Sequence, residues 1–319
     1  MEGLVSSAAL GFNLKTRGMF RDKFGYVCAA DKGSGFVRIQ RQSGTDLPDS
    51  IVFQHKIKEF LCKNGVLVDN FLISTQGTPY FALGGDYFVA TKAFGQSFPV
   101  GDFANNEFFL TFIGNLAKMH SLLALLDVEG SSKFCKEKSV AKAAESLVVL
   151  RKKLLKAGKF SEFDMLFLKG CERFMGHIEN YANIPDDVLN NRRYICHNIL
   201  KEENIYNDGG KIIITNFSEA GHGHYLFDLA YALKRRLKVK PGTGILPDVL
   251  FDTYLENFSH EKTLNQEIFR HILLYPDKFI KISLDYYSKK RSFAPKTYLF
   301  RMEECFLANE AIMEYIGKT

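Results

Sequence analysis

The stretch from Tyr194 to Lys234 constrains the fold of this chain more than any other part of the sequence. Its residues predict a short apolar strand, a loop, two strands joined by the Gly209-Gly210 turn, and then a helix. His197 and Asn204 lie seven residues apart in the loop, and the last strand runs into Thr215-Asn216-Phe217. The loop is therefore predicted to be held between strands, with a helix directly after them.

The order of predicted elements divides the whole chain into two lobes. Residues 1–93 are β-prone, and one helix is predicted from the apolar spacing at 50–64. The predicted strands of this lobe are 23–30, 36–40, 71–74, 80–83 and 86–93. Residues 94–319 are predicted to be mostly helical. The predicted helices of this lobe are 105–126, 138–159, 162–182, 246–258, 264–274, 277–290 and 295–316. The expected fold class is α+β, with a small β-rich N-lobe (1–93) and a large helical C-lobe (94–319).

This layout is typical of a bilobal protein-kinase-like fold. The spacing of His197 and Asn204 is that of a kinase catalytic loop, and the strand after the turn takes the place of the metal-binding strand. The spacing alone is weak evidence. A preceding β-rich lobe, flanking strands and a following helix that carries Asp228 make it stronger. Residues 194–218 are therefore predicted to be the catalytic-loop region of a phosphotransferase scaffold.

Three further segments add a family resemblance that covers nearly the whole chain. They are SEFDMLFL at 161–168, FDLA at 227–230, and LYPDKF at 274–279 running on to YYSKK at 286–290. With these motifs the chain resembles the CotS-type spore coat proteins, a branch of the aminoglycoside-phosphotransferase-like superfamily. The resemblance implies cytoplasmic synthesis, a final place in a bacterial spore coat, and other spore coat proteins as partners.

The resemblance also aligns the catalytic loop. Active relatives carry His-Gly-Asp-x-x-x-x-Asn there, and His197 and Asn204 match its His and Asn without a gap. Asn198 stands in place of the Gly, and Ile199 in place of the catalytic Asp. That Asp must be a carboxylate, because it orients the acceptor hydroxyl and takes its proton. An isoleucine side chain does neither.

The metal strand departs from the family pattern as well. Where active relatives carry Ile-Asp-Phe-Asp, Asn216 replaces the metal-binding Asp and Ser218 replaces the last Asp, while Phe217 is kept. Magnesium prefers anionic oxygens, so the pair Asn204 and Asn216 would hold it only weakly, through a nucleotide's own phosphates. Arg38 falls where the phosphate-contacting Lys would sit, and its fork is larger than an ammonium. No metal or cofactor is expected, and ATP with magnesium only if the site has stayed active.

Two groups near the loop leave alternatives open. Glu202 and Glu203 lie within the loop and could supply a substitute base, although solvated loop carboxylates are the commoner case. His222 and His224 are expected to lie near Cys196 and His197 across the two strands, which raises the alternative of a metal cluster formed by these residues. Loop histidines around a flexible glycine are the simpler interpretation.

Two residues are given structural roles. By the resemblance, Asp228 braces the catalytic loop by accepting backbone hydrogen bonds, which would persist after activity is lost. His197 is interpreted as organising the loop rather than titrating in a reaction.

Charge and composition limit the partners. Lys and Arg exceed Asp and Glu by 42 − 36 = 6, a mild basic excess. The basic runs 234–240 and 289–291 are interpreted as solvated helix ends, and no nucleic-acid motif accompanies them. No run of 18 apolar residues exists and no signal sequence is recognised, so no membrane partner is expected. The six cysteines form no CxxC pair and are expected to be buried thiols.

Three functions remain open on sequence grounds. The first is a pseudokinase that acts as a structural or interaction component of a spore coat. The second is an active ATP-dependent phosphotransferase that acts on a small hydroxyl substrate with an unusual base. The third is a module that binds a nucleotide or metabolite without turning it over.

Overall fold

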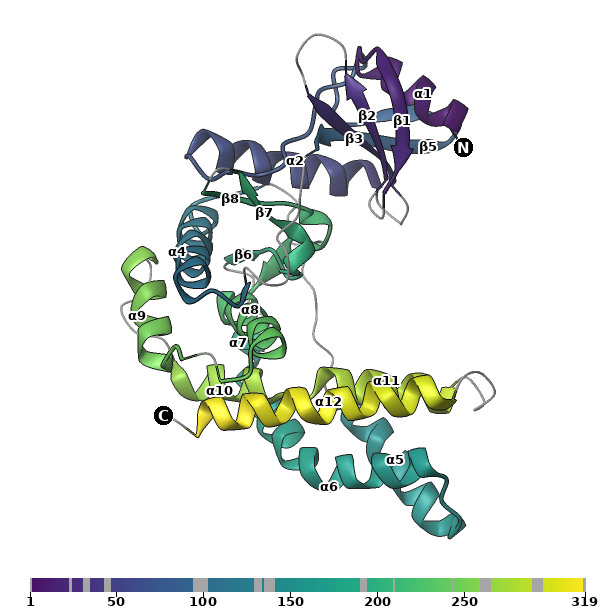
Figure 1. Ribbon diagram of the computed structural model, residues 1–319, viewed down its shortest axis with the longest axis vertical. Helices are drawn as coiled ribbons and strands as arrows, with labels where there is room; N and C mark the ends of the chain where they lie inside the picture. Colours follow the sequence, from purple (N-terminus) through teal and green to yellow (C-terminus); the bar gives the residue numbers. More distant parts are fainter. Residues whose placement is uncertain are drawn as a thin grey trace.

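The computed structural model shows an elongated bilobal α+β protein, with a small sheet at one end and helices making up the remainder (Figure 1). The described residues are 2–22, 25–30, 35–42, 47–93, 103–128, 134, 141–189, 194–208, 210–242, 244–258, 265–288 and 295–317. The predicted fold class is confirmed. The predicted join near residue 94 lies at a gap, because residues 94–102 are outside the described part.

The N-lobe is a five-stranded antiparallel sheet with strand order β1-β2-β3-β5-β4. The strands are β1 (Thr16–Arg21), β2 (Tyr26–Ala30), β3 (Phe36–Gln42), β4 (Phe81–Leu83) and β5 (Asp86–Lys92). Helix α1 (Glu2–Gly11) and helix α2 (Leu47–Lys63) accompany the sheet. The predicted strands at 23–30, 36–40, 80–83 and 86–93 correspond to β2 to β5, and the predicted helix at 50–64 corresponds to α2.

Three features of this lobe differ from the prediction. Helix α1 was not expected, because Val5, Ala8 and Ala9 bury only a short apolar face between flanking glycines. Strand β1 was not expected, because its sequence TRGMFR lacks the alternation that marks a strand. The predicted strand at 71–74 was wrong: apart from an isolated bridge from Phe71 to Thr91, no strand is assigned there.

The C-lobe helices lie close to their predicted bounds, except for the short α7, which was not predicted. They are α4 (Asn106–Leu123), α5 (Ala141–Ala157), α6 (Glu162–Ala182), α7 (Asp186–Leu189), α8 (Tyr225–Val239), α9 (Pro247–Asn257), α10 (Gln266–Leu274), α11 (Asp277–Ser288) and α12 (Pro295–Ile316). Helix α6 begins at a capping box, in which Ser161 and Asp164 satisfy each other's backbone N–H groups. None of the helices in the described part is long and apolar enough to cross a membrane.

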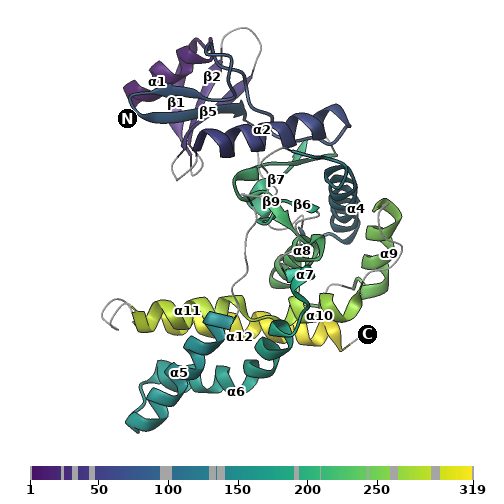
Figure 2. The same cartoon turned by 180° about the vertical axis from the view of Figure 1, so that it is seen from behind.

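The catalytic-loop region (194–218) lies between the sheet and the C-lobe helices (Figure 2). Strand β6 (Tyr194–Cys196) pairs with β9 (Gly221–Gly223), and β7 (Ile205–Asp208) pairs with β8 (Lys211–Ile214). Two short 3-10 turns, η2 (Glu202–Asn204) and η3 (Phe217–Glu219), fill the gaps between these strands. The predicted strand–loop–hairpin–helix order is confirmed.

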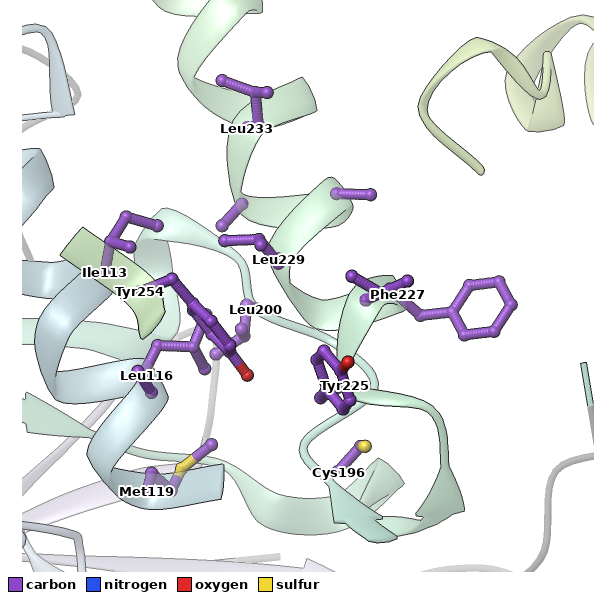
Figure 3. Packing of buried hydrophobic residues seen from close by; sticks show 14 of the residues in the cluster. Ile113, Leu116, Met119, Cys196, Leu200, Tyr225, Phe227, Leu229, Leu233 and Tyr254 are labelled. Atoms are coloured by element: carbon purple, nitrogen blue, oxygen red, sulfur yellow. The ribbon is translucent and has the colours of Figure 1, made fainter. Parts of the chain in front are cut away.

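Two cores support the C-lobe. The larger one packs α4, α8 and α9 around the strands of the catalytic-loop region, with Leu116, Leu229 and Tyr254 among its members (Figure 3). The second core joins α5, α6, α11 and α12. Gly170 is needed there, because a Cβ at this position would lie 2.2 Å from the Phe279 ring. The expectation that cysteines are buried was wrong for Cys62, which is exposed.

The chain after α2 ties the two lobes together. The backbone N–H of Ile214 donates to the Leu67 carbonyl at 3.0 Å, and Val68 forms a parallel bridge with the same residue. Because Ile214 is the last residue of β8, this contact fixes the end of the hairpin against the N-lobe. The residues that follow Ile214 therefore lie at the lobe boundary.

Candidate functional site

Asp228, in the first turn of α8, accepts hydrogen bonds from the backbone of the catalytic loop. Its carboxylate accepts the backbone N–H of His197 at 2.7 Å and that of Asn198 at 2.8 Å. The carboxylate is 1% exposed, yet hydrogen bonds hold its pKa below the usual value although burial opposes the charged form. These are the backbone hydrogen bonds that the sequence analysis expected of Asp228.

His120 on α4 is a partner that the sequence analysis missed. Its Nε2 lies 3.0 Å from an Asp228 oxygen, and its Nδ1 lies 2.6 Å from the Tyr254 hydroxyl on α9. The histidine is fully buried on the apolar face of α4, beside Leu116 and Met119. A polar residue on an apolar helical face was the available signal, since such a group needs a buried partner.

His197 is enclosed and serves the loop. Its ring is buried, contacts Phe217 at a centroid distance of 4.8 Å, and places Nε2 2.9 Å from the Thr215 carbonyl. Burial lowers the pKa of His197, and the nearby Asp228 only partly offsets this. The neutral ring links the loop to the end of β8, as its predicted organising role requires.

Asn198 explains how the loop keeps its shape without the glycine of active relatives. Its φ is +65°, in the left-handed region that Asn tolerates better than most residues. Its side-chain amide donates to the carbonyl oxygens of Glu219 at 3.1 Å and Gly221 at 3.3 Å. The substitution is thus compatible with the backbone turn and adds hydrogen bonds to it.

Asn204 and Asn216, the two positions that would hold a metal, are hydrogen-bonded to each other. Asn204 donates its amide N–H to the Ile199 carbonyl at 2.9 Å, which turns its amide oxygen toward Asn216. Asn216 donates its own amide N–H to that oxygen at 3.3 Å. An N–H donor therefore faces the oxygen that a cation would otherwise contact.

Ile199 lies on the same loop and is partly buried. Its carbonyl accepts the Asn204 hydrogen bond, and its side chain carries no group that can accept a proton. At this position the loop therefore offers a backbone acceptor and no side-chain acid or base.

Glu202 is not free to replace that carboxylate. It forms a two-pronged ion pair with Arg235 of α8, with N–O distances of 2.6 and 2.5 Å. Glu203 is more exposed and lies 3.9 Å from the Lys201 ammonium. Among the described residues, those that line the cavity next to the loop include Asn204 but neither glutamate.

A buried ion pair that the sequence analysis missed lies beside Asn216. Lys58 on α2 places its ammonium 3.0 Å from an Asp69 carboxylate oxygen and 3.0 Å from the Asp69 carbonyl. The other Asp69 oxygen accepts the backbone N–H of Asn216 at 3.3 Å. Burial lowers the pKa of Lys58, and the Asp69 charge partly offsets this. The signal was again a charged residue on an apolar face, between Ile57 and Leu61 of α2.

Arg38 on β3 lines the same cavity from the sheet side. Its guanidinium forms hydrogen bonds at 2.7 and 3.1 Å with one carboxylate oxygen of Asp22, which follows β1. Arg38, which stands in place of the phosphate-contacting Lys, therefore lines this cavity. Its guanidinium is already paired with Asp22.

The interlobe cavity has a volume of about 210 Å³. Its described lining residues come from the sheet, from α2 and from the catalytic-loop region, and they include Arg38, Arg41, Lys58, Asp69 and Asn216. Each of the three cations in this lining already pairs with a carboxylate: Arg38 with Asp22, Arg41 with Asp86 and Lys58 with Asp69. For a divalent cation the donor set fits poorly, because the two amides bond each other and Asp69 already faces Lys58.

The metal cluster considered around His222 and His224 does not form. His224 caps the start of α8 by accepting the Leu226 N–H at 3.3 Å. Cys196 instead lies near His120 and Asp228, with ligand-type atoms within 4.8 Å of one another. Since His120 and Asp228 already bond each other, a hydrogen-bond network accounts for this group.

The first three residues of the basic run 234–240 make contacts within the protein. Arg236 is fully buried and binds the Phe103 carbonyl and the Asn106 side chain. Lys234 donates to the Tyr275 carbonyl at 2.8 Å, and Arg235 pairs with Glu202. The interpretation of this run as a solvated helix end was therefore wrong for residues 234–236, whereas Lys238 and Lys240 are exposed. The run 289–291 lies outside the described residues.

Comparisons with known structures place the fold. An aminoglycoside phosphotransferase from Alicyclobacillus acidocaldarius matches with a TM-score of 0.75 at 15% identity, covering 98% of this chain and 94% of that one. A spectinomycin phosphotransferase in complex with ADP and spectinomycin matches with a TM-score of 0.70 at 12% identity, covering 98% and 97%. The choline kinase LicA from Streptococcus pneumoniae matches with a TM-score of 0.57 at 11% identity, covering 99% of each chain.

These matches establish the class of fold. The chain has the kinase-like fold of aminoglycoside phosphotransferases and related small-molecule kinases, as predicted. No protein-family model matches the sequence. The search of curated proteins found no relative either.

Proposed function

We propose that this protein is a pseudokinase, a kinase-fold scaffold that no longer transfers phosphoryl groups. The observation that carries the proposal is the hydrogen bond between Asn204 and Asn216. In an active site these two positions would hold magnesium between oxygens, and the metal would neutralise the charge that develops on the phosphoryl group. Here the pair is satisfied without a cation.

The missing base supports the same proposal. With Ile199 at the catalytic position and Glu202 engaged by Arg235, no carboxylate among the described residues of the loop is poised toward the cavity. Loss of both the base and the metal ligand removes two independent contributions to the rate. An active phosphotransferase is therefore the weaker alternative.

We further infer that the scaffold serves as a structural or interaction component. The resemblance to CotS-type spore coat proteins supports a place in a spore coat and coat proteins as partners. The structure is compatible with this role, because the hydrogen bonds that Asp228 accepts stabilise the loop independently of any reaction.

A second candidate function is binding of an anionic metabolite or nucleotide without turnover. Such a ligand would occupy the interlobe cavity, where Arg38, Arg41 and Lys58 form part of a polar lining. The spectinomycin phosphotransferase of the same fold was crystallised with ADP, which makes nucleotides the first ligands to try.

A turnover assay combined with a thermal-shift titration tests both candidates. The pseudokinase proposal predicts no ATP hydrolysis or phosphoryl transfer by the wild-type protein, with magnesium or manganese present. Binding without turnover predicts a thermal shift, since a ligand at about 100 times its Kd adds about 2.7 kcal/mol of stability. Turnover that is lost in Glu202→Gln or Glu203→Gln would overturn the proposal and restore the enzyme interpretation.

A further inference from the structure

The C-terminal end of α5 and the turn that leads to α6 carry a concentrated positive charge. Residues 151–160 contain five basic residues and no acidic one. These residues are Arg151, Lys152, Lys153, Lys156 and Lys159. Because the whole chain nets +6, the rest of the protein nets only 6 − 5 = 1. Nearly all of the excess charge is thus placed in one short segment.

These cations point to solvent rather than to partners in the protein. All five residues are exposed, and none of them has an ion pair among the described residues. The run 234–240 is the opposite case, because Arg235 and Arg236 of that run are spent on internal contacts. An external anion can therefore contact these five cations.

Apolar side chains stand among the cations. Leu155 is 52% exposed, Phe160 is 43% exposed and Met165 is 57% exposed. Phe160 directly precedes the N-cap residue Ser161, and Met165 lies in the first turn and a half of α6, the positions of a hydrophobic staple. A staple explains why two apolar residues occur there, yet both keep about half of their surface exposed.

The position of this segment is also distinctive. The α5–α6 hairpin lies at the end of the molecule opposite the sheet, and both views show it projecting from the remaining helices (Figures 1 and 2). The buried faces of α5 and α6 pack on each other and on α11 and α12 through Leu147, Leu154 and Phe167. The exposed tip is thus carried on a well-packed support.

We propose that this basic tip, residues 151–165, binds the surface of an anionic lipid membrane. Clusters of four to eight Lys and Arg on a helix attract anionic headgroups, and neighbouring Leu, Phe and Met side chains enter the boundary between headgroups and acyl chains. The interleaved apolar residues favour a lipid surface over nucleic acid, which rewards charge and base stacking. Binding to the membrane surface needs no membrane-spanning segment. The expectation of no membrane partner rested on the lack of such a segment, so it does not exclude this contact.

The absence of tryptophan from the sequence allows a direct test. Phe160→Trp introduces a single reporter at the tip, and Phe36→Trp introduces a matched reporter at an exposed site of the sheet, at the opposite end. With vesicles of phosphatidylcholine containing roughly a third phosphatidylglycerol, the Phe160→Trp emission should shift to the blue. The Phe36→Trp emission should not change, and neither reporter should respond to pure phosphatidylcholine.

Cosedimentation with the same vesicles measures the contribution of charge. Lys152→Gln with Lys156→Gln should lower binding by on the order of tenfold or more. Lys56→Gln with Lys118→Gln removes the same charge from exposed positions on α2 and α4 and should leave binding unchanged. Binding should also weaken between about 0.1 M and 1 M salt, as the screening length shortens.

Other outcomes would overturn the proposal. These are no binding to anionic vesicles at low salt, equal loss in the two double variants, or binding without a blue shift of Phe160→Trp. Tight binding to duplex DNA or poly-glutamate with no binding to vesicles would assign the tip to an acidic macromolecule instead. None of these results depends on the state of the interlobe cavity.

Discussion

The two sides of the catalytic-loop region differ in what their polar groups are bonded to. On the side that faces α8, Asp228 joins His120 and two backbone N–H groups of the loop in a fully buried network. On the side that faces the cavity, Asn204 and Asn216 bond each other, and no catalytic carboxylate stands at Ile199. The contrast teaches that the support of a catalytic loop and its chemistry are separable, because they use different residues.

The buried pair of Lys58 and Asp69 belongs to the cavity side, and both of its residues lie in the N-lobe. A kinase pairs a Lys on its third strand with a Glu on its helix, both in the small lobe. Here the cation is on α2 and the anion follows it in the chain, and Asp69 also binds the Asn216 N–H. Asp69 thus provides a contact between the lobes on the cavity side.

The largest expected effect comes from breaking the α8 side. Asp228→Ala leaves the N–H groups of His197 and Asn198 and the His120 ring without their acceptor. Loss of a buried, hydrogen-bonded charge typically costs about 3–5 kcal/mol, and we expect a loss of that order in urea unfolding. Asp277→Ala is the control, because Asp277 is exposed and lies 3.6 Å from Lys234. A loss below about 1 kcal/mol in Asp228→Ala would contradict the bracing role.

The next effect comes from the buried ion pair of Lys58 and Asp69, which lies beside the lobe boundary. Lys58→Met leaves Asp69 buried without its counter-ion, and we expect about 3 kcal/mol of destabilisation. The double variant Lys58→Met with Asp69→Asn removes both charges and should recover a large part of that loss. An additive double variant would show that the two residues act independently.

Acidification should weaken the α8 side before the cavity side. Burial lowers the pKa of His197 in the folded protein, so the unfolded chain binds more protons as pH falls below about 6.5. Stability should therefore fall as pH drops from 7 toward 5. His197→Gln should flatten this part of the profile, measured as Tm against pH. Asp228 adds a further loss only at lower pH, since its pKa is depressed below its usual value.

The smallest effect is expected at the glutamates of the loop. Glu202→Gln removes one charge of a partly exposed ion pair with Arg235, which is worth about 0–1 kcal/mol. Glu203→Gln should change the free energy of unfolding even less. A loss well above 1 kcal/mol at Glu202 would mean that this pair supports the loop as strongly as the α8 side does.

The sequence predicted the fold well where patterns were long and regular. Helix α6 was predicted at its observed bounds, because Ser161 and Asp164 mark its start and apolar residues recur on one face. Helix α1 and strand β1 were missed, because short segments rich in glycine and small or charged residues carry weak periodicity. The long-range order of lobes was correct because it depends on many elements together.

The site was predicted in outline and completed by the structure. Spacing and resemblance identified His197, Ile199, Asn204, Asn216 and Asp228. They did not show that Asn204 bonds Asn216 or that Lys58 pairs with Asp69, because side-chain orientation decides these contacts. They did not show that Asp69 meets Asn216, because these residues lie far apart in the chain. The basic runs give the same lesson, since the sequence does not show which lysines and arginines find internal partners.

Nucleotide titration with and without magnesium tests the central claim most directly. The account predicts that magnesium changes the ATP affinity of the wild-type protein by less than about threefold, whether that affinity is weak or strong. Asn216→Asp, which restores an anionic ligand opposite Asn204, should gain magnesium dependence of about tenfold or more. A wild-type affinity that already rises tenfold with magnesium would contradict the account, because it would mean that the two asparagines hold the metal as a carboxylate would.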